Sequence, residues 1–403
     1  MPSGVGESAL PCTLSSVITQ SIPIRALIVD DGRSGTGLAL ARELGAAGHE
    51  VGFATADRDS FVARSRSIRR RHHVPSARAD LTGFVEAVER LAPGYDLAVG
   101  TGDAEVLAIA TAAERLPLVL AHPPLPILQS VLDKRVITEV AASLGIRTPR
   151  TWALDELPPG APDRFAVKPR LHWRASDHAG PTQPTRLLDR AELLALDEPG
   201  SLLAQEVLPG RLGALVLVLD KAGTVVGQHQ QVASAVYPVG AGNCVRGRTV
   251  PVDPERAERG AELLRRLGFW GLAQLEYLEC DEGPEALIDV NPRPYGSMGL
   301  AVAAGLAPAA TLVEVALDRH PLPQRASRPG VRYSSLGLDL RRAARERRGG
   351  LLPDTAVTIS SALGAQHAVW SWRDPRPALK QWQGTAVRAL RRLSRAGTAD
   401  GPG

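Results

Sequence analysis

The sequence has few cysteines and very few lysines. Its three cysteines, Cys12, Cys244 and Cys280, lie far apart and show no C-x-x-C spacing. This pattern argues against a disulfide framework and a zinc site, and it suits a reducing cytoplasm, where we expect the protein to be. Of the 47 basic residues only four are lysines, and the other 43 are arginines. A position that is still lysine in such a chain is a candidate for a role that needs a compact ammonium group.

The chain also lacks a long uninterrupted apolar run. Its longest uncharged stretch, PYGSMGLAVAAGLAPAATLV, has about the length of a transmembrane helix, but glycine and proline interrupt it. We therefore expect a buried helix there and no membrane segment. Residues 1–22 contain no basic leader before an apolar core, so we expect a flexible tail rather than a signal peptide.

Aromatic residues make up only 4% of the chain. The net charge is +4, and basic clusters occur at 64–73, 341–348 and 388–395. No aromatic side chains alternate with these basic residues in a way that would stack nucleobases. We therefore expect no nucleic-acid partner and interpret the clusters as solvated helix faces or as charges that steer a substrate.

The first part of the chain alternates short apolar runs with helical patterns. Strands are expected at RALIVDD (25–31), HEVGFATAD (49–57) and DLAVGTGD (96–103), with amphipathic helices between them. This order predicts parallel βαβ units in a small doubly wound domain. The glycine-rich first turn does not match G-x-G-x-x-G, because Leu40 occupies the third glycine position, which disfavours a nicotinamide oxidoreductase.

The second half combines strands, hairpins and capped helices. Helices are expected from Asp133 to Gly145, over 252–268 with Asp253 as the cap, and over 300–318. Strands are expected at 165–170, 202–210, 213–231 with a turn at Lys221, 271–278 and 286–291. A short strand at VTISSAL (357–363) and a final basic amphipathic helix complete the pattern.

The strands 271–278 and 286–291 carry the most informative polar residues. Alternation places Gln274, Glu276 and Leu278 on one face of the first strand, and Leu287, Asp289 and Asn291 on one face of the second. A hairpin would bring Glu276 and Asp289 within roughly 5–8 Å. Two such carboxylates with an amide oxygen form a ligand set suited to Mg²⁺ and nucleotide phosphates. A solvent-facing polar side of a hairpin is the alternative interpretation.

Two lysines favour the metal interpretation. Lys134 begins a helix, and Lys168 ends the apolar strand FAVKPR. Burial of an ammonium group is costly unless an anion lies beside it. The sequence contains neither GxxxxGK[ST] nor the HRD and DFG elements of protein kinases, so a P-loop enzyme and a protein kinase are both excluded by motif.

In this set of motifs the chain resembles the ATP-grasp superfamily, particularly its carboxylate–amine ligases and carboligases. The resemblance covers about residues 121–320 and rests on five segments in order: LDKRVITEVAASLGIRTPRT, FAVKP, LLAQEVLPG, GLAQLEYL and LIDVNPRPYGSMGLAVAAG. It implies an α/β chain with a Rossmann-like preATP-grasp domain and a two-lobed ATP-grasp domain. The expected divisions are a tail (1–22), the preATP-grasp domain (23–121), the lid lobe (122–205), the metal-binding lobe (206–325) and a basic C-terminal extension (326–403).

The resemblance also implies a role for each matching residue. Lys134 and Lys168 would contact ATP phosphates, and Gln205, Glu206 and the Val207 backbone would hold the adenine edge. Glu276, Asp289 and Asn291 would ligate Mg²⁺, with two ions expected and Mn²⁺ as a substitute. Arg293 would stabilise the transferred phosphate or the acyl intermediate, and Arg246 is a weaker candidate for the same region.

This chain departs from the family pattern in three places. The family often has glutamate at the position of Asp289. The loop after KP (170–184) is usually rich in glycine and serine, but here it reads RLHWRASDHAGPTQP, so arginine and histidine side chains would cover the phosphates. His172 and His178 are either contacts of this kind or surface residues without a role. The acid that often follows PG to hold the ribose is missing from PGRLGAL.

The implied reaction is amide formation from a carboxylate and an amine, with an acyl phosphate as intermediate and ADP and phosphate as products. The expected partners are small carboxylates and amines, first of all an amino acid or peptide, and a homodimer is the candidate assembly. Carboxylation, formate-dependent ligation, phosphotransfer and a non-catalytic nucleotide-binding regulator are the alternatives. Residues 330–403 would complete the fold, pair subunits or cover the acceptor site.

Overall fold

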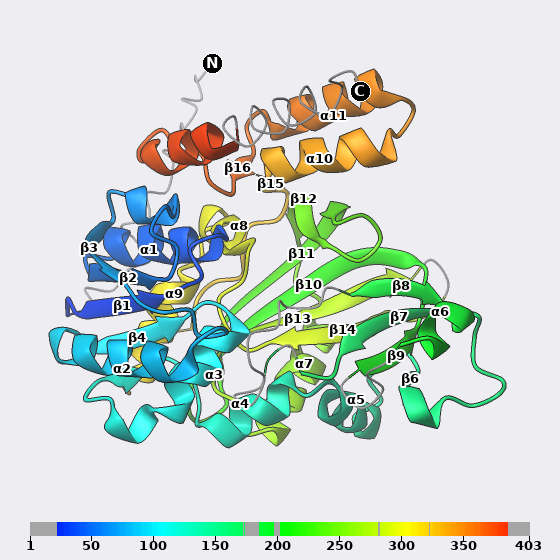
Figure 1. Ribbon diagram of the computed structural model, residues 1–403, viewed down its shortest axis with the longest axis horizontal. Helices are drawn as coiled ribbons and strands as arrows, with labels where there is room; N and C mark the ends of the chain where they lie inside the picture. Colours follow the sequence, from blue (N-terminus) through cyan, green and yellow to red (C-terminus); the bar gives the residue numbers. More distant parts are fainter. Residues whose placement is uncertain are drawn as a thin grey trace, which may run out of the picture.

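The computed structural model describes residues 22–171, 173, 185–196, 202–280, 283–321 and 323–385, which form three β-sheets with helices packed around them (Figure 1). The first sheet is parallel and the other two are largely antiparallel, as the predicted fold class requires. In the described parts of the chain, no helix has both the length and the apolar character needed to cross a membrane.

The first sheet confirms the predicted doubly wound arrangement. Its order is β3-β2-β1-β4-β5, with β1 Arg25–Val29, β2 Glu50–Thr55, β3 Ile68–His73, β4 Leu97–Gly100 and β5 Val119–Leu120. Its helices are α1 Thr36–Ala46, α2 Leu81–Leu91 and α3 Asp103–Thr111. Ala26 and Ile28 pack in one core cluster with α1, and Leu27 and Val29 pack in another with α2 and α3. Both faces of the sheet are therefore covered, which explains the continuous apolar run of β1.

The order of strands reverses between β1 and β4. In parallel sheets a crevice opens at such a switch point, outside the carboxyl ends of the two strands. The loops that follow β1 and β4 therefore flank a crevice on the edge of the sheet that faces the rest of the molecule.

The second sheet is small and lies in the part of the chain that was expected to form the lid lobe. Its order is β6-β9-β7-β8, with β6 Thr151–Ala153, β7 Arg164–Pro169, β8 Arg186–Asp189 and β9 Leu202–Glu206. Helices α4 Leu125–Leu132 and α5 Lys134–Ser143 precede it, and α6 Arg190–Leu194 follows β8. The Asp133 side chain accepts a hydrogen bond from the Arg135 amide and caps α5 as predicted. Most of the loop 170–184, including His172 and His178, lies outside the described residues.

The third sheet has seven strands in the order β14-β13-β10-β11-β12-β15-β16. These are β10 Gly210–Leu219, β11 Val225–Tyr237, β12 Asn243–Val250, β13 Gly271–Cys280, β14 Ala286–Asn291, β15 Arg332–Ser334 and β16 Gln366–His367. Helix α7 Pro254–Arg266 is capped by Asp253, as predicted. The helix expected over 300–318 is divided into α8 Met298–Ala303 and α9 Pro308–Ala316, because Gly305 has φ +99° and Pro308 begins a new helix.

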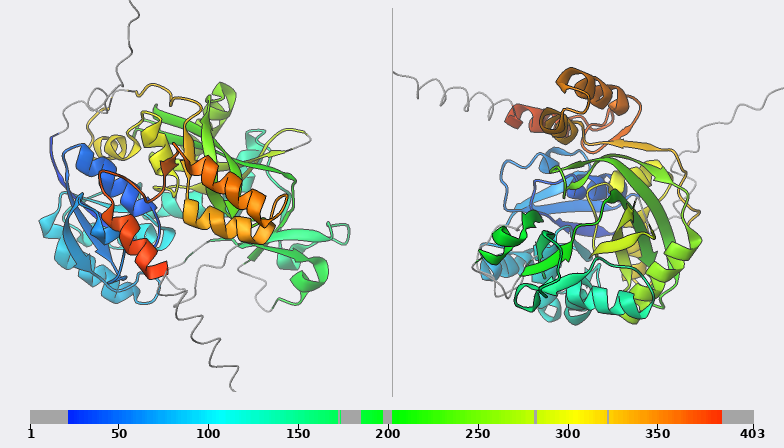
Figure 2. Two further views of the ribbon diagram at one scale, coloured as in Figure 1. Left: turned by 90° about the horizontal axis from the view of Figure 1, so that it is seen from above. Right: turned by 90° about the vertical axis from the view of Figure 1, so that its right-hand side faces the viewer.

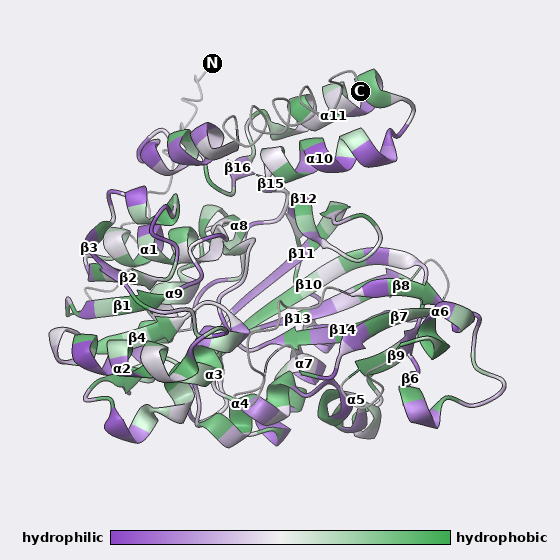
Figure 3. Ribbon diagram, viewed as in Figure 1, coloured by the Kyte–Doolittle hydropathy of each residue, from purple (hydrophilic) through white to green (hydrophobic). Residues whose placement is uncertain are grey.

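Helix α9 connects the first and third sheets. Its residues Leu312 and Val313 belong to the same core cluster as Ile28 of β1 and Val216 of β10. Hydrophobic residues occupy most of α3 and α9 in Figure 3, and nearly all of their residues are buried. This shared core fixes the parallel domain against the large sheet.

The region after residue 330 adds two strands to the third sheet and two helices, α10 Leu336–Glu346 and α11 Leu351–Ala362, that lie above it (Figure 2). The strand expected at VTISSAL is wrong, because these residues form the end of α11. Asp354 and Thr358, one turn apart, both bind the buried Arg342 of α10. Tertiary contacts therefore override the alternating pattern. Residues 376–385 are helical, and the basic stretch 388–395 lies outside the described residues.

Candidate functional site

A cavity of about 1860 Å³ is lined by residues from all three sheets. The third sheet contributes β13 and β14, the second contributes β7 and β9, and the parallel domain contributes the loops after β1 and β4. Of the residues predicted from the sequence, eight line the cavity: Lys168, Gln205, Glu206, Val207, Glu276, Asp289, Asn291 and Arg293.

The two acids of the predicted metal set lie side by side. Glu276 is directly opposite Asp289 in the antiparallel β13–β14 ladder, and Gln274 is opposite Asn291. The Asn291 amide nitrogen donates to the Gln274 side chain over 3.4 Å, and the Asn291 side-chain oxygen accepts from Arg293. The three oxygen-bearing side chains therefore share one face of the sheet and face the cavity.

The ladder contains an irregularity that the sequence pattern did not indicate. The register shifts after Glu276, so that Tyr277 pairs with Leu287 and Ile288 is the extra residue. Leu287 consequently packs in the core with Val290 instead of sharing a face with Asp289. The extra residue also turns the Ile288 carbonyl toward Lys168, whose Nζ donates to it over 3.1 Å.

Both predicted lysines reach this acidic pair. Lys134 Nζ lies 3.5 Å from Asp289 Oδ1, although Lys134 is buried and does not itself line the cavity. Lys168 is the next-to-last residue of β7 and is 7% exposed. Burial lowers the pKa of Lys168 to about 8, an effect to which Lys134 adds and which Asp289 and Glu276 oppose. Two ammonium groups and two carboxylates are thus gathered on one side of the cavity.

The three predicted adenine-edge residues lie at the end of β9. Gln205 donates to Thr151 Oγ1 over 2.9 Å, which orients its side chain. Glu206 accepts two hydrogen bonds from Arg150, from the backbone amide at 3.0 Å and from the side-chain Nε at 2.6 Å. Val207 is the first residue after β9 and is 41% exposed. It lines the cavity at a point where the chain is no longer paired with a neighbouring strand.

Arg293 is held from both sides. Its Nε donates to Asp103, at the start of α3 in the parallel domain, and its Nη2 donates to Asn291 Oδ1 over 3.0 Å. The Asp103 carboxylate raises the pKa of Arg293 against the opposing effect of burial. The guanidinium is therefore fixed beside the metal-type ligand set by an acid about 190 residues away in the sequence.

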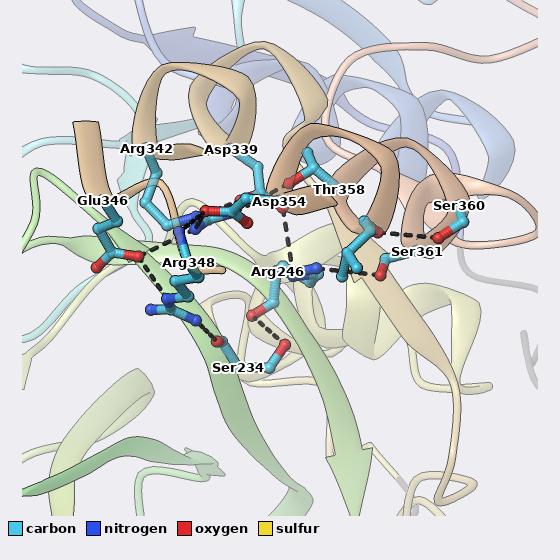
Figure 4. Close-up of polar contacts among 11 residues, drawn as sticks. Ser234, Arg246, Asp339, Arg342, Glu346, Arg348, Asp354, Thr358, Ser360 and Ser361 are labelled. Atoms are coloured by element: carbon cyan, nitrogen blue, oxygen red, sulfur yellow. Dashed lines mark hydrogen bonds and ion pairs between the residues drawn. The ribbon is translucent and has the colours of Figure 1, made fainter. Parts of the chain in front are cut away.

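The structure does not bring Arg246 to this group. Figure 4 shows its side chain among the residues of α10 and α11, where Nε lies 3.3 Å from Asp339 Oδ2 and Nη1 donates to Ser361. Asp339 also binds the fully buried Arg342, which in turn binds Asp354. Arg246 therefore belongs to an ion-pair network that attaches the two helices to the sheet.

Sequence reasoning missed Asp103 and the C-terminal wall of the cavity. A signal for Asp103 was present, because GTGD follows a buried parallel strand next to the first strand of the sheet, where a switch point opens. The cavity lining at 333–341 and 367–385 carries no comparable motif.

The oxygen atoms of Glu276, Asp289 and Asn291 are chemically suited to Mg²⁺. Across the described ranges no group of three or more His, Cys, Asp or Glu side chains is arranged to hold a metal ion. If each side chain binds through one oxygen, Glu276, Asp289 and Asn291 together supply three hard oxygen ligands. A six-coordinate Mg²⁺ would then need further oxygens from water or a phosphorylated ligand, which is its usual mode of binding.

Comparison with solved structures identifies the fold. No protein-family model and no curated protein sequence matches the chain. The L-amino acid ligase of Bacillus licheniformis is 16% identical with a TM-score of 0.57, covering 74% of this chain and 77% of that one. The biotin carboxylase domain of the Hydrogenobacter thermophilus 2-oxoglutarate carboxylase, solved with MgADP and bicarbonate, is 13% identical with a TM-score of 0.60, covering 77% and 74%. An ADP complex of N5-carboxyaminoimidazole ribonucleotide synthetase is 12% identical with a TM-score of 0.60, covering 82% and 87%. The chain has the ATP-grasp fold.

Proposed function

We propose that the protein is an ATP- and Mg²⁺-dependent ligase that joins a carboxylate to an amine through an acyl phosphate. The observation that carries this proposal is the direct pairing of Glu276 with Asp289, with Lys134 and Lys168 beside them, in a cavity of an ATP-grasp fold. Two acids next to two lysines form a site for an ion and an anion together.

The charges at the site support a metal–nucleotide complex rather than a free metal ion. Lys134 and Lys168 already offset the charges of Glu276 and Asp289, and Arg293 is paired with Asp103, so a divalent cation alone would add repulsion. Nucleotide phosphates would bring the negative charge that balances both the cation and the lysines. Two of the three structural neighbours described above were solved with ADP, one of them with magnesium. Glu276, Asp289 and Asn291 would hold the metal, which would neutralise phosphate charge.

Each of the remaining residues has a role in positioning. Lys168 would bind phosphate oxygens, and Gln205, Glu206 and the Val207 backbone would fix the base at the end of β9. Arg293, held by Asp103, would point a permanent positive charge at the group being transferred. In this scheme no protein side chain forms a covalent bond, so positioning and charge neutralisation supply the catalysis.

The proposed reaction has two steps. A carboxylate oxygen attacks the γ-phosphorus and ADP leaves, which gives an acyl phosphate. The amine nitrogen then attacks the acyl carbon, phosphate leaves with the bonding electron pair, and the amine loses a proton. The products are an amide, ADP and phosphate.

Carboxylation of a substrate with bicarbonate is the second candidate. It is favoured by the biotin carboxylase domain, which was solved with bicarbonate and whose TM-score of 0.60 is no lower than that of the amino acid ligase, 0.57. The fold alone does not separate the two reactions.

An ADP-release screen over pooled carboxylates and amines, with mass detection of products, tests the proposal. We expect release that requires one carboxylate and one amine, a product equal in mass to their sum minus water, and loss of turnover in Asp289→Ala. Release that requires bicarbonate and no amine would favour carboxylation. ATP binding without ADP release in any pool would favour a regulator.

A further inference from the structure

The C-terminal segment 366–385 is anchored to the parallel domain. Asp374 is 4% exposed and accepts hydrogen bonds from Arg42 Nε at 3.0 Å, Ser65 Oγ at 2.7 Å and the Arg66 amide at 3.1 Å. Arg42 also donates to the backbone carbonyls of Val369 and Asp374. The segment therefore runs from β16 of the large sheet to the parallel domain and is fixed at β16 and at Asp374.

This segment forms one wall of the cavity. Its residues Val369, Trp370, Lys380 and Trp382 line the cavity together with Phe61 and the loop 31–36 of the parallel domain. We call this part the far chamber. The cavity volume of about 1860 Å³ exceeds the roughly 300–1,000 Å³ of a typical small-molecule site, so it has room for a second ligand beside a nucleotide.

Three tryptophans meet at this wall, but only two line the chamber. Trp370 and Trp382 stack with ring centroids 5.5 Å apart and an interplanar angle of 15°. Trp372 contacts Trp370 edge-on, is 86% exposed and does not line the cavity. Trp382 is 53% exposed, so an indole surface is left open to a ligand within the chamber. Aromatic surface of this kind gains free energy from contact with another ring or a large apolar group.

Four of the charged side chains that line the cavity are paired with each other. Lys380 Nζ lies 2.5 Å from Asp59 Oδ1, and Arg293 is bound to Asp103. These pairs reduce the charge that the chamber offers to a ligand. Asp31 and Asp57 also line the cavity, and for this reason a cationic ligand is the rival that the test must separate.

We propose that the far chamber binds the aromatic or large apolar side chain of the second substrate, with Trp382 and Trp370 as the surface that selects it. The chemical class is an aromatic amino acid, which carries both a carboxylate and an amine. This inference rests on the proposed ligase function, because it assigns the chamber to a substrate of that reaction.

The test measures binding without turnover. Affinities of L-phenylalanine, L-alanine and L-arginine for the full chain are measured by ligand-observed NMR in the presence of MgADP. We expect phenylalanine to bind at least about tenfold more tightly than either competitor. Trp382→Ala should weaken phenylalanine binding by about tenfold and leave MgADP affinity unchanged. Trp372→Ala is the matched control and should change neither affinity.

Other outcomes overturn the inference. Equal affinities for phenylalanine and alanine, tighter binding of arginine, or equal effects of Trp382→Ala and Trp372→Ala would each do so. If thermal unfolding shows that Trp382→Ala does not fold, Trp382→Leu keeps apolar packing without the indole ring, and it too should weaken phenylalanine binding. If phenylalanine binding depends on Trp382 but no ADP is released, the proposed reaction is contradicted and the assignment of the chamber stands. If only small or acidic amino acids cause ADP release, the assignment of the chamber is contradicted and the proposed reaction stands.

Discussion

Lys134, the first residue of α5, places its Nζ 3.5 Å from Oδ1 of Asp289, which lies on the edge strand β14. The contact joins the helix that precedes the second sheet to the pair of acids on the large sheet. It also means that Asp289 is already neutralised by a cation before any ligand binds. This has a consequence for the binding of metal ions.

We expect Mg²⁺ to bind only together with a nucleotide. Mg²⁺ alone must approach Asp289 against the charges of Lys134 and Lys168, whereas ADP or ATP supplies compensating phosphates. Isothermal titration calorimetry should detect MgADP binding to the wild type and no binding of Mg²⁺ by itself at matched concentrations. Lys134→Met should strengthen binding of the metal alone. Tight Mg²⁺ binding by the wild type without nucleotide would contradict this prediction.

Lys168→Met should weaken binding of MgADP. Loss of one charge-assisted hydrogen bond costs about 1.5–3 kcal/mol, which corresponds to about 10–100-fold in affinity. Lys221→Met is the matched control, because Lys221 pairs with Asp318 at the surface and does not line the cavity. Calorimetric titration of both variants checks the prediction. Equal affinities of the two variants would show that Lys168 does not bind the nucleotide.

Substitutions of Arg293 and Arg246, the two arginines proposed from the sequence, should have different effects on turnover and on stability. Arg293→Gln should lower kcat/KM for ADP release by about 10²–10³, the typical loss when a group that stabilises transition-state charge is removed. Arg246→Gln should leave kcat/KM within a few-fold of the wild type. It should instead lower the free energy of unfolding by about 1–3 kcal/mol, because the fully buried Asp339 keeps its partner Arg342 but loses a second cation. The reverse pattern, with turnover lost in Arg246→Gln only, would contradict the site.

Glu43 should make stability depend on pH. Its Oε1 accepts hydrogen bonds from the amides of Ala309 and Ala310, and burial raises its pKa to about 8. Between the ordinary pKa of glutamate and about 8, the folded state holds a proton that the unfolded state has lost. The free energy of unfolding therefore falls as pH rises, by at most about 1.4 kcal/mol per pH unit from this group.

The comparison with Glu43→Gln isolates this contribution. The glutamine keeps a carbonyl oxygen for the two amides but cannot ionise. Urea unfolding at pH 5.5, 7 and 8.5 should show a steeper decrease for the wild type than for the variant. Parallel decreases would mean that Glu43 does not titrate in this range.

Local patterns predicted the parts of the fold that depend on local chemistry. The caps at Asp133 and Asp253 and the alternation in β13 follow from hydrogen bonding and strand geometry within a few residues. The direct pairing of Glu276 with Asp289 follows from a hairpin whose two strands are close in the sequence.

The errors arose where distant contacts decide the structure. The extra residue Ile288 is invisible to a period-two pattern, and its effect was to move Leu287 into the core. VTISSAL alternates like a strand, but it forms a helix because Asp354 and Thr358 bind Arg342 on the neighbouring helix. Arg246 was only a weaker candidate implied by the family resemblance, and in the structure it pairs with Asp339 among the C-terminal helices. Asp103 was missed because its partner Arg293 is far away in the chain.

The most direct test of the ligase reaction is an omission experiment with the substrates found by the screen. ADP release is measured with carboxylate and amine together, with each one omitted, and with bicarbonate in place of the amine, for the wild type and Asp289→Asn. We predict one ADP per amide formed, background release when either substrate is omitted, and no turnover by Asp289→Asn. Wild-type turnover by Asp289→Asn, or ADP release that does not depend on the amine, would contradict the account.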